Sequence, residues 1–255
     1  MDDDTITQLK NFIATQQHDT CPGIQNSDRR GRTVLVTGAS SGIGKLIALS
    51  YARAGAPKIG IIAPRPLGEV EAHLTATATN AGHPVPQVLK LVADVTDEKS
   101  INKAAYKLKK EFRCLDILVN NIGRVKTISS ILDSDPGDWW RTWEVNIKGV
   151  YLTIRAFLLI SLQGGEKAIA NIGLMGQVSP VPGQGILSFI VYPGDVPTEV
   201  RGSFPKELAQ YFVDTPRLPE DSITWLTQKR LDWCPDDSSD LGGIYQRWSA
   251  VKRKL

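Results

Sequence analysis

A glycine-rich turn between an apolar run and a helical stretch constrains the fold of this chain most strongly. The run 33–37 is typical of a buried strand, and Gly38, Gly42 and Gly44 follow it where a helix begins. The first glycine permits a tight turn, the second lets the backbone approach a pyrophosphate, and the third allows close helix packing. The helix N-terminus then presents N–H groups to the phosphates. The pattern predicts a dinucleotide site rather than a plain turn, with contacts from Gly38, Ser40, Ser41, Gly42, Ile43 and Gly44.

Apolar runs alternate with helical stretches from Arg32 onward, which is typical of βαβ units in a parallel sheet. We expect strands at 33–37, 59–63, 88–92, 116–120, 168–172 and 186–192. Helices are expected over 44–54, 97–112 and, as one long helix, 136–162. The fold class is therefore α/β, a Rossmann-type doubly wound parallel sheet. Residues 1–30 are interpreted as an N-terminal arm, 31–200 as the dinucleotide-binding domain, and 201–255 as a C-terminal, substrate-side segment of that domain.

The connection between the fifth and sixth expected strands departs from this pattern. Residues 173–185 contain four glycines and two prolines, and both residue types break helices. A parallel crossover usually carries a helix, so that helix is predicted to be missing here. The apolar side chains around Val150, Ile154 and Phe157 on the long helix are then expected to lack a partner.

Composition narrows the class of protein further. The formal charge of +3 is spread along the chain, which predicts binding to neither nucleic acid nor membrane. The acidic start and the shortness of the longest apolar run, 156–160, argue against a signal peptide and a membrane span. Three widely spaced cysteines without a Cys-x-x-Cys pair predict no metal site and suit a reducing compartment, so we expect a cytoplasmic protein.

The turn and four further motifs resemble those of the short-chain dehydrogenase/reductase family, and they occur in the same order along the chain. They are Thr-Gly-x-x-x-Gly-x-Gly at 37–44, Asp94-Val-Thr, Asn120-Asn-Ile-Gly123, Val145-Asn-Ile-Lys-Gly149 and Tyr192-Pro-Gly-Asp-Val-Pro-Thr198. The resemblance covers about residues 20–200, and Asp19-Thr-Cys-Pro and Ser222-Ile-Thr-Trp-Leu-Thr look similar to a fungal branch.

The resemblance implies a role for each matching position. Asp94 would contact the adenine, although it is also suited to a turn or helix cap. Asn120, Asn121 and Gly123 would steady the sheet and border the nicotinamide ribose. The cofactor-binding residues near the carboxamide would be Val196 and Thr198.

The end of the second strand distinguishes NADP from NAD. An acidic residue there would bind the ribose 2′-hydroxyl and repel a 2′-phosphate. This chain instead has Ala63-Pro-Arg65, with no carboxylate before Glu69. Arg65 can pair with the phosphate, so NADP is predicted over NAD, the alternative being a solvated loop arginine.

Catalysis in the resembling family uses a serine, a Tyr-x-x-x-Lys pair and an asparagine. Asn146 matches the asparagine, but Leu174 stands at the serine position and the Tyr-x-x-x-Lys helix is missing. The pair Tyr106 and Lys110 lies among other lysines, which is typical of a solvated helix face.

Two readings of the function remain open at this point. The first is an NADP-dependent oxidoreductase that reduces a carbonyl or oxidises a secondary alcohol, of doubtful activity. The second is a non-catalytic dinucleotide-binding pseudoenzyme or truncated gene product, and the family-type dimer is in doubt without the missing helix. Trp139, Trp140 and Trp143 begin the long helix, where they either stack on an aromatic substrate or pack against other elements.

Overall fold

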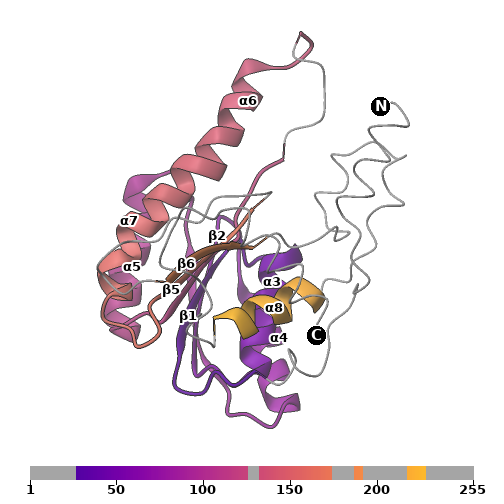
Figure 1. Ribbon diagram of the computed structural model, residues 1–255, viewed down its shortest axis with the longest axis vertical. Helices are drawn as coiled ribbons and strands as arrows, with labels where there is room; N and C mark the ends of the chain where they lie inside the picture. The colour runs from indigo at the N-terminus through magenta and orange to yellow at the C-terminus, as the bar shows by residue number, and fades with distance from the viewer. Residues whose placement is uncertain (1–26, 126–131, 174–186, 192–216, 228–255) are drawn as a thin grey trace, which may run out of the picture.

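Six parallel strands form one sheet at the centre of the computed structural model, in the order β3-β2-β1-β4-β5-β6 (Figure 1). The structure describes residues 27–125, 132–173, 187–191 and 217–227. The strands are β1 (Thr33–Thr37), β2 (Lys58–Ala63), β3 (Gln87–Val92), β4 (Ile117–Asn120), β5 (Ala168–Ile172) and β6 (Leu187–Val191). Each lies within one residue of its predicted bounds, and the predicted doubly wound parallel sheet is confirmed. The crossover 174–186, where a missing helix was predicted, lies outside the described residues.

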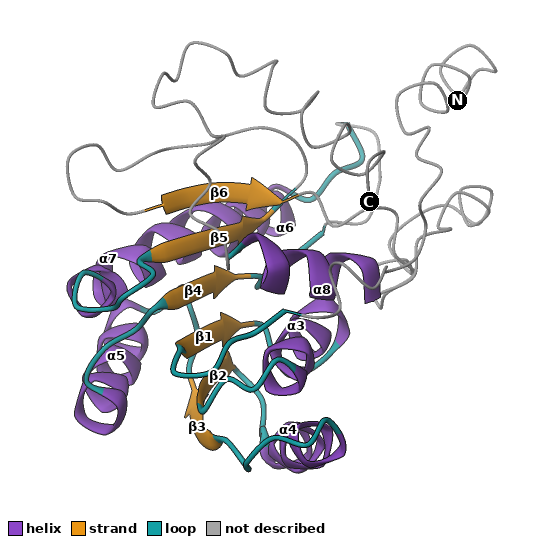
Figure 2. Cartoon of the chain, turned by 60° about the horizontal axis from the view of Figure 1, so that its bottom comes forward, coloured by secondary structure: helices purple, strands orange, loops and turns teal. Residues whose placement is uncertain are grey.

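Helices cover both faces of the sheet (Figure 2). On one face lie α3 (Gly42–Arg53), α4 (Gly68–Asn80) and α8 (Arg217–Leu226), and on the other lie α5 (Glu98–Phe112) and α7 (Gly149–Ser161). Each face of the sheet has its own apolar core. Successive residues of β1 pack into the two cores alternately, because side chains alternate along a strand. Val34 and Val36 pack with α3 and α4, whereas Leu35 packs with α5 and α7.

The stretch predicted as one long helix consists of three consecutive helical segments. A π-helical turn, η1 (Glu144–Lys148), separates α6 (Pro136–Trp143) from α7. The apolar pattern over 136–162 indicates a helix but does not distinguish a π-helical turn from an α-helical one. In Figure 1, α7 lies against the sheet and α6 extends past it.

The prediction that the long helix would lack partners is wrong for its sheet-facing side. Phe157 is 0% exposed, and Ile154 packs against the same core. The partner is α5, which lies beside α7 and contributes Leu108 and Phe112 to that core. Val150 is half-buried.

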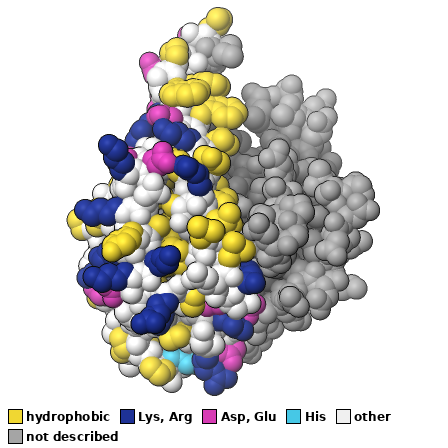
Figure 3. Space-filling view, turned by 90° about the vertical axis from the view of Figure 1, so that its left-hand side faces the viewer, with side chains coloured by type: hydrophobic (Ala, Val, Ile, Leu, Met, Phe, Trp, Pro, Cys, Tyr) yellow, Lys and Arg dark blue, Asp and Glu magenta, His cyan; other side chains and the backbone are white. Residues whose placement is uncertain are grey.

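The opposite side of this helix does carry exposed apolar side chains. They recur about every four residues, which places them along one helix face. Figure 3 shows apolar side chains gathered along the projecting part of the helix, and the exposed ones are Trp139, Trp140, Trp143, Ile147, Tyr151 and Leu159. The ring centroids of Trp139 and Trp143 are 5.5 Å apart, so these two side chains contact each other.

Two helices, α4 and α8, were not predicted from the sequence. The buried face of α4 consists of only three residues at four-residue spacing, Val70, Leu74 and Ala78. In α8 the buried side chains that the structure describes include the polar Asp221 and Thr224 as well as Ile223. Specific polar contacts therefore contribute to holding this helix in place.

Those contacts attach α8 to α3 and to the segment before β1. The guanidinium of Arg29, 1% exposed, donates from Nε and Nη1 to the carbonyl oxygens of Thr224 and Thr227, each at 3.0 Å. Ser50 donates to Asp221 at 2.8 Å, and the Tyr51 hydroxyl lies 2.9 Å from the Thr227 hydroxyl. These bonds satisfy buried polar groups that would otherwise destabilise the fold.

Glu220 is the least well paired charged group in this contact. Its Oε1 accepts from Arg53 at 3.3 Å, while its Oε2 has no hydrogen-bond partner in the described part of the chain. Burial, reinforced by repulsion from Asp221, raises the pKa of Glu220 to about 7. The folded state therefore binds this proton more tightly than the unfolded state does.

This linkage predicts that stability falls as pH rises. The contribution is fully present below the ordinary pKa of 4.5 and is lost as pH rises through about 7. Between pH 5 and pH 8 we expect wild type to lose up to about 3 kcal/mol of unfolding free energy that Glu220→Gln does not lose. Urea unfolding across that pH range measures the unfolding free energy of both proteins, and the exposed Glu111→Gln variant is the control. Equal pH profiles for wild type and Glu220→Gln would contradict the prediction.

Candidate cofactor-binding site

The glycine turn after β1 adopts a backbone that side chains would obstruct. Gly38 and Gly42 have positive φ angles of 67° and 55°. A Cβ at Gly38 would lie 2.9 Å from the Cα of Ile122, and one at Gly44 would overlap the carbonyl oxygen of Gly38. The glycines therefore allow the turn to pack closely against the loop after β4, while Ser40, Ser41 and Ile43 are partly exposed.

Asn121 and Thr37 join this turn to the end of β4. The Asn121 amide Nδ2 donates to the carbonyl oxygens of Thr37 at 3.2 Å and Gly38 at 3.4 Å. In return, the Thr37 hydroxyl oxygen accepts from the backbone N–H groups of Asn121 at 3.0 Å and Ile122 at 3.2 Å. Asn121 therefore holds the turn itself, and Thr37 is an anchor that the sequence prediction did not single out.

Asn120 steadies the sheet next to this anchor. Its side chain is 2% exposed, and its Nδ2 donates to Oδ1 of Asn171 on β5 at 2.8 Å. Its own Oδ1 has no hydrogen-bond partner among the described residues. The pair links the carboxyl ends of β4 and β5, the edge where parallel sheets bind ligands.

Asn146, on η1, fixes the loop that follows β4. Its Oδ1 accepts from the backbone N–H of Arg124, and its Nδ2 donates to the carbonyl oxygen of Arg124, both at 2.8 Å. A Cβ at Gly123 would lie 3.7 Å from the same Oδ1, so the loop passes close to the helix. A pocket of about 200 Å³ beside it is lined by Thr142, Trp143, Asn146 and Ile147.

Asp94 and Arg65 lie after β3 and β2, on the other side of the site. The Asp94 Oδ1 accepts from the Thr96 N–H at 2.9 Å and from its hydroxyl at 2.8 Å, so the turn suggested by the sequence is present. Although burial acts to raise it, the Thr96 hydrogen bonds and the Arg141 charge hold the pKa of Asp94 below its usual value. Arg65 is exposed, and Asp97 caps α5 by accepting from the Lys99 N–H at 2.9 Å.

The structure does not describe the remaining predicted residues. Val196 and Thr198, and Leu174 at the serine position, lie outside the described residues. Within the described ranges, no group of three or more His, Cys, Asp or Glu side chains is placed to hold a metal ion. None of the helices described is long and apolar enough to span a membrane.

A parallel sheet with a glycine turn at its reversal point defines a dinucleotide-binding protein of Rossmann type. A family model described as short chain dehydrogenase matches residues 32–203. "Short chain dehydrogenase andI" of Emericella variicolor is 49% identical over 252 positions, covering 89% of this chain and 87% of that protein. The chain therefore belongs to the short-chain dehydrogenase/reductase family.

More distant proteins share the fold. An "NADP-dependent 3-hydroxy acid dehydrogenase" of Schizosaccharomyces pombe is 36% identical over 154 residues, covering 60% of this chain and 58% of that protein. The solved structure of L-sorbose reductase from Gluconobacter frateurii superposes with a TM-score of 0.66 and 19% identity, covering 82% of this chain and 94% of that one. This structural likeness establishes the common fold.

The family binds a nicotinamide dinucleotide, and the residues present fit such a group. The turn from Gly38 to Gly44 has no side chain at its three glycines and leads into α3, whose first N–H groups suit a pyrophosphate. The carboxyl ends of β1, β2, β3 and β4 face the same edge, so one extended ligand can contact the turn, Arg65, Asp94 and the loop after β4.

Gly44→Ala tests whether this turn needs its bare backbone. The added methyl would overlap the Gly38 carbonyl and the Asn121 amide, so we expect a loss of about 1–3 kcal/mol in unfolding free energy and weaker NADPH binding. Gly68→Ala, in the first turn of α4 with nothing within 4 Å of the new Cβ, is the matched control. Thermal melting and NADPH titration measure both variants, and a Gly44→Ala protein matching the control would contradict the prediction.

Proposed function

We propose that this protein binds NADP(H) and is an oxidoreductase that acts on a carbonyl or secondary alcohol, with turnover limited by missing catalytic groups. The observation that carries the proposal is the glycine turn at Gly38–Gly44, which Asn121 holds at the point where the strand order reverses. Family membership supports the reaction class. A small-molecule substrate and a cytoplasmic location are part of the same proposal.

The preference for NADP rests on the end of β2. Ala63 is buried, Pro64 and Arg65 are exposed, and no carboxylate lies between them and α4. Glu69, the first acidic residue, lies on α4, where its Oε1 is 3.5 Å from Nζ of Lys45. A 2′-phosphate would therefore meet a guanidinium rather than a carboxylate. The NADP dependence named for the Schizosaccharomyces pombe relative supports the same choice.

The chain's own residues give an incomplete catalytic apparatus. A bound nicotinamide would supply the hydride for carbonyl reduction, or accept it in alcohol oxidation. Asn146 holds the loop after β4 in place, which positions one wall of the site. The serine and the Tyr-x-x-x-Lys pair of the family have no counterparts at the expected places in the sequence. Loss of a general acid typically lowers the rate by about 10² to 10⁴, so we expect slow turnover.

A second candidate is a non-catalytic dinucleotide-binding protein or a truncated gene product. The alignment with the Emericella variicolor relative spans 252 positions, but 89% of these 255 residues is only about 227. About 25 aligned positions, the difference between 252 and 227, therefore hold no residue of this chain. A single gap of that size would accommodate the helix that is absent from the sequence between 173 and 185.

Cofactor titration tests the first part of the proposal. We expect NADPH to bind more tightly than NADH, and Arg65→Ala to weaken NADPH roughly 5- to 50-fold while leaving NADH nearly unchanged. Calorimetry measures the four affinities, and Lys103→Ala on the exposed face of α5 controls for the loss of one positive charge. Equal NADPH and NADH affinities in the wild type would refute the NADP assignment.

Turnover and the gene sequence decide between the two candidates. With NADPH and a panel of ketones and aldehydes, we expect at most slow, cofactor-dependent oxidation of NADPH. The genomic DNA around codon 185 is expected to encode a Tyr-x-x-x-Lys helix if the chain is truncated. Rapid turnover by the purified chain would show that the missing groups are replaced by others and would overturn both expectations.

A further inference from the structure

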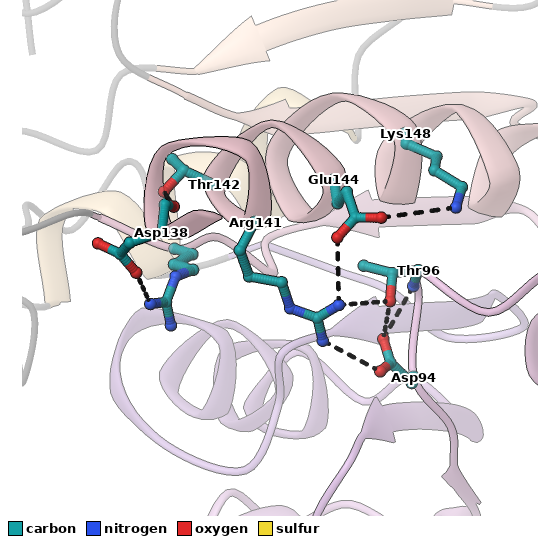
Figure 4. Close-up of polar contacts among 8 residues, drawn as sticks. Asp94, Thr96, Asp138, Arg141, Thr142, Glu144 and Lys148 are labelled. Atoms are coloured by element: carbon teal, nitrogen blue, oxygen red, sulfur yellow. Dashed lines mark hydrogen bonds and ion pairs between the residues drawn. The ribbon is translucent and has the colours of Figure 1, made fainter. Parts of the chain in front are cut away.

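A row of charged side chains on α6 and η1 lies over the turn between β3 and α5 (Figure 4). The Arg141 Nη2 lies 3.5 Å from Oδ2 of Asp94, and its Nη1 lies 3.4 Å from the Thr96 hydroxyl. The same Nη1 is 3.4 Å from Glu144, whose other carboxylate oxygen is 3.9 Å from Lys148 Nζ. Arg141 is therefore directed at the residue that the family motif assigns to the adenine.

Close packing fixes the distance between this helix and the turn. A Cβ at Gly149, where α7 begins, would lie only 2.8 Å from Cγ2 of Val95. Val95 is 1% exposed and belongs to the same core as Phe157. Because Val95 directly follows Asp94, this contact holds the helix beside the carboxylate.

The two oxygens of the Asp94 carboxylate have different surroundings. Oδ1 accepts two hydrogen bonds from Thr96, whereas Oδ2 faces Arg141. The side chains of Asp94 and Arg141 are 46% and 47% exposed, so a ligand can reach both. An acceptor and a donor thus stand side by side at the carboxyl edge of β3.

Adenine presents the complementary arrangement, because its N6 amine is a donor and the neighbouring ring nitrogens are acceptors. We propose that Arg141 is an adenine-binding residue: Asp94 accepts from the N6 amine while Arg141 donates to the adjacent ring nitrogen. This inference rests on the proposed function, since it requires a dinucleotide in the site. Hypoxanthine carries a carbonyl oxygen in place of the amine, and that oxygen would face the Asp94 carboxylate.

A purely structural ion pair would behave differently from an adenine contact. Exposed arginine–carboxylate pairs contribute little to stability, and their loss does not depend on which base the ligand carries. Arg155 on α7 offers the matched comparison, because it pairs with Glu98 at the start of α5 and both side chains are more than half exposed. Removing Arg155 breaks a similar exposed pair, between α7 and the start of α5, away from Asp94.

The test titrates NADPH and its hypoxanthine analogue against wild type, Arg141→Ala, Arg141→Gln and Arg155→Ala, with thermal melting of each protein. We expect Arg141→Ala to weaken NADPH roughly 5- to 30-fold and to reduce the wild-type preference for adenine over hypoxanthine. Arg141→Gln, which keeps an amide donor, should retain part of that preference. Arg155→Ala should match wild type for both ligands.

The outcomes separate this inference from the proposed function. A wild type that melts cooperatively but binds neither ligand would overturn the dinucleotide site, and the role of Arg141 with it. The role of Arg141 alone would be overturned by a different result. In that case wild type binds NADPH, and Arg141→Ala has the same NADPH affinity and the same preference for adenine over hypoxanthine.

Discussion

The hydrogen bonds among Thr37, Gly38 and Asn121 are the constraint on which the rest of the site depends. They join the turn after β1 to the end of β4, at the point where the strand order reverses. A turn with positive φ angles is costly for most residues, and here glycine removes that cost while Asn121 fixes the geometry. The backbone of the turn is thereby shaped in the absence of a ligand, and such preorganisation reduces the ordering that binding requires.

The continuous helical stretch of α6 and η1 contacts the segments that follow both β3 and β4. Asn146 on η1 fixes the loop after β4, and Arg141 on α6 contacts the turn after β3. The π-helical turn begins after Arg141 and contains Asn146, and the opposite face of the helical stretch carries exposed apolar side chains. The same stretch therefore joins the turn after β3 to the loop after β4.

The sequence predicted the sheet well because buried parallel strands are short apolar runs bounded by turns, and all six fall within one residue of their expected ends. It missed α8, where the polar residues Asp221 and Thr224 are buried beside Ile223. It missed Arg141 as well, since the contact with Asp94 joins residues 47 positions apart, and no local pattern encodes such a pair. The turn at Gly38 was foreseeable because its chemistry is local.

The burial of Arg29 has a consequence for the order in which the chain folds. Its carbonyl partners, Thr224 and Thr227, lie 195 and 198 positions later, so this guanidinium stays hydrated until nearly the whole chain has been synthesised. The sheet from β1 to β3 and its helices involve much shorter separations and can form earlier, because loop closure costs less entropy over short distances. Docking of α8 is then a late step that closes the fold over α3.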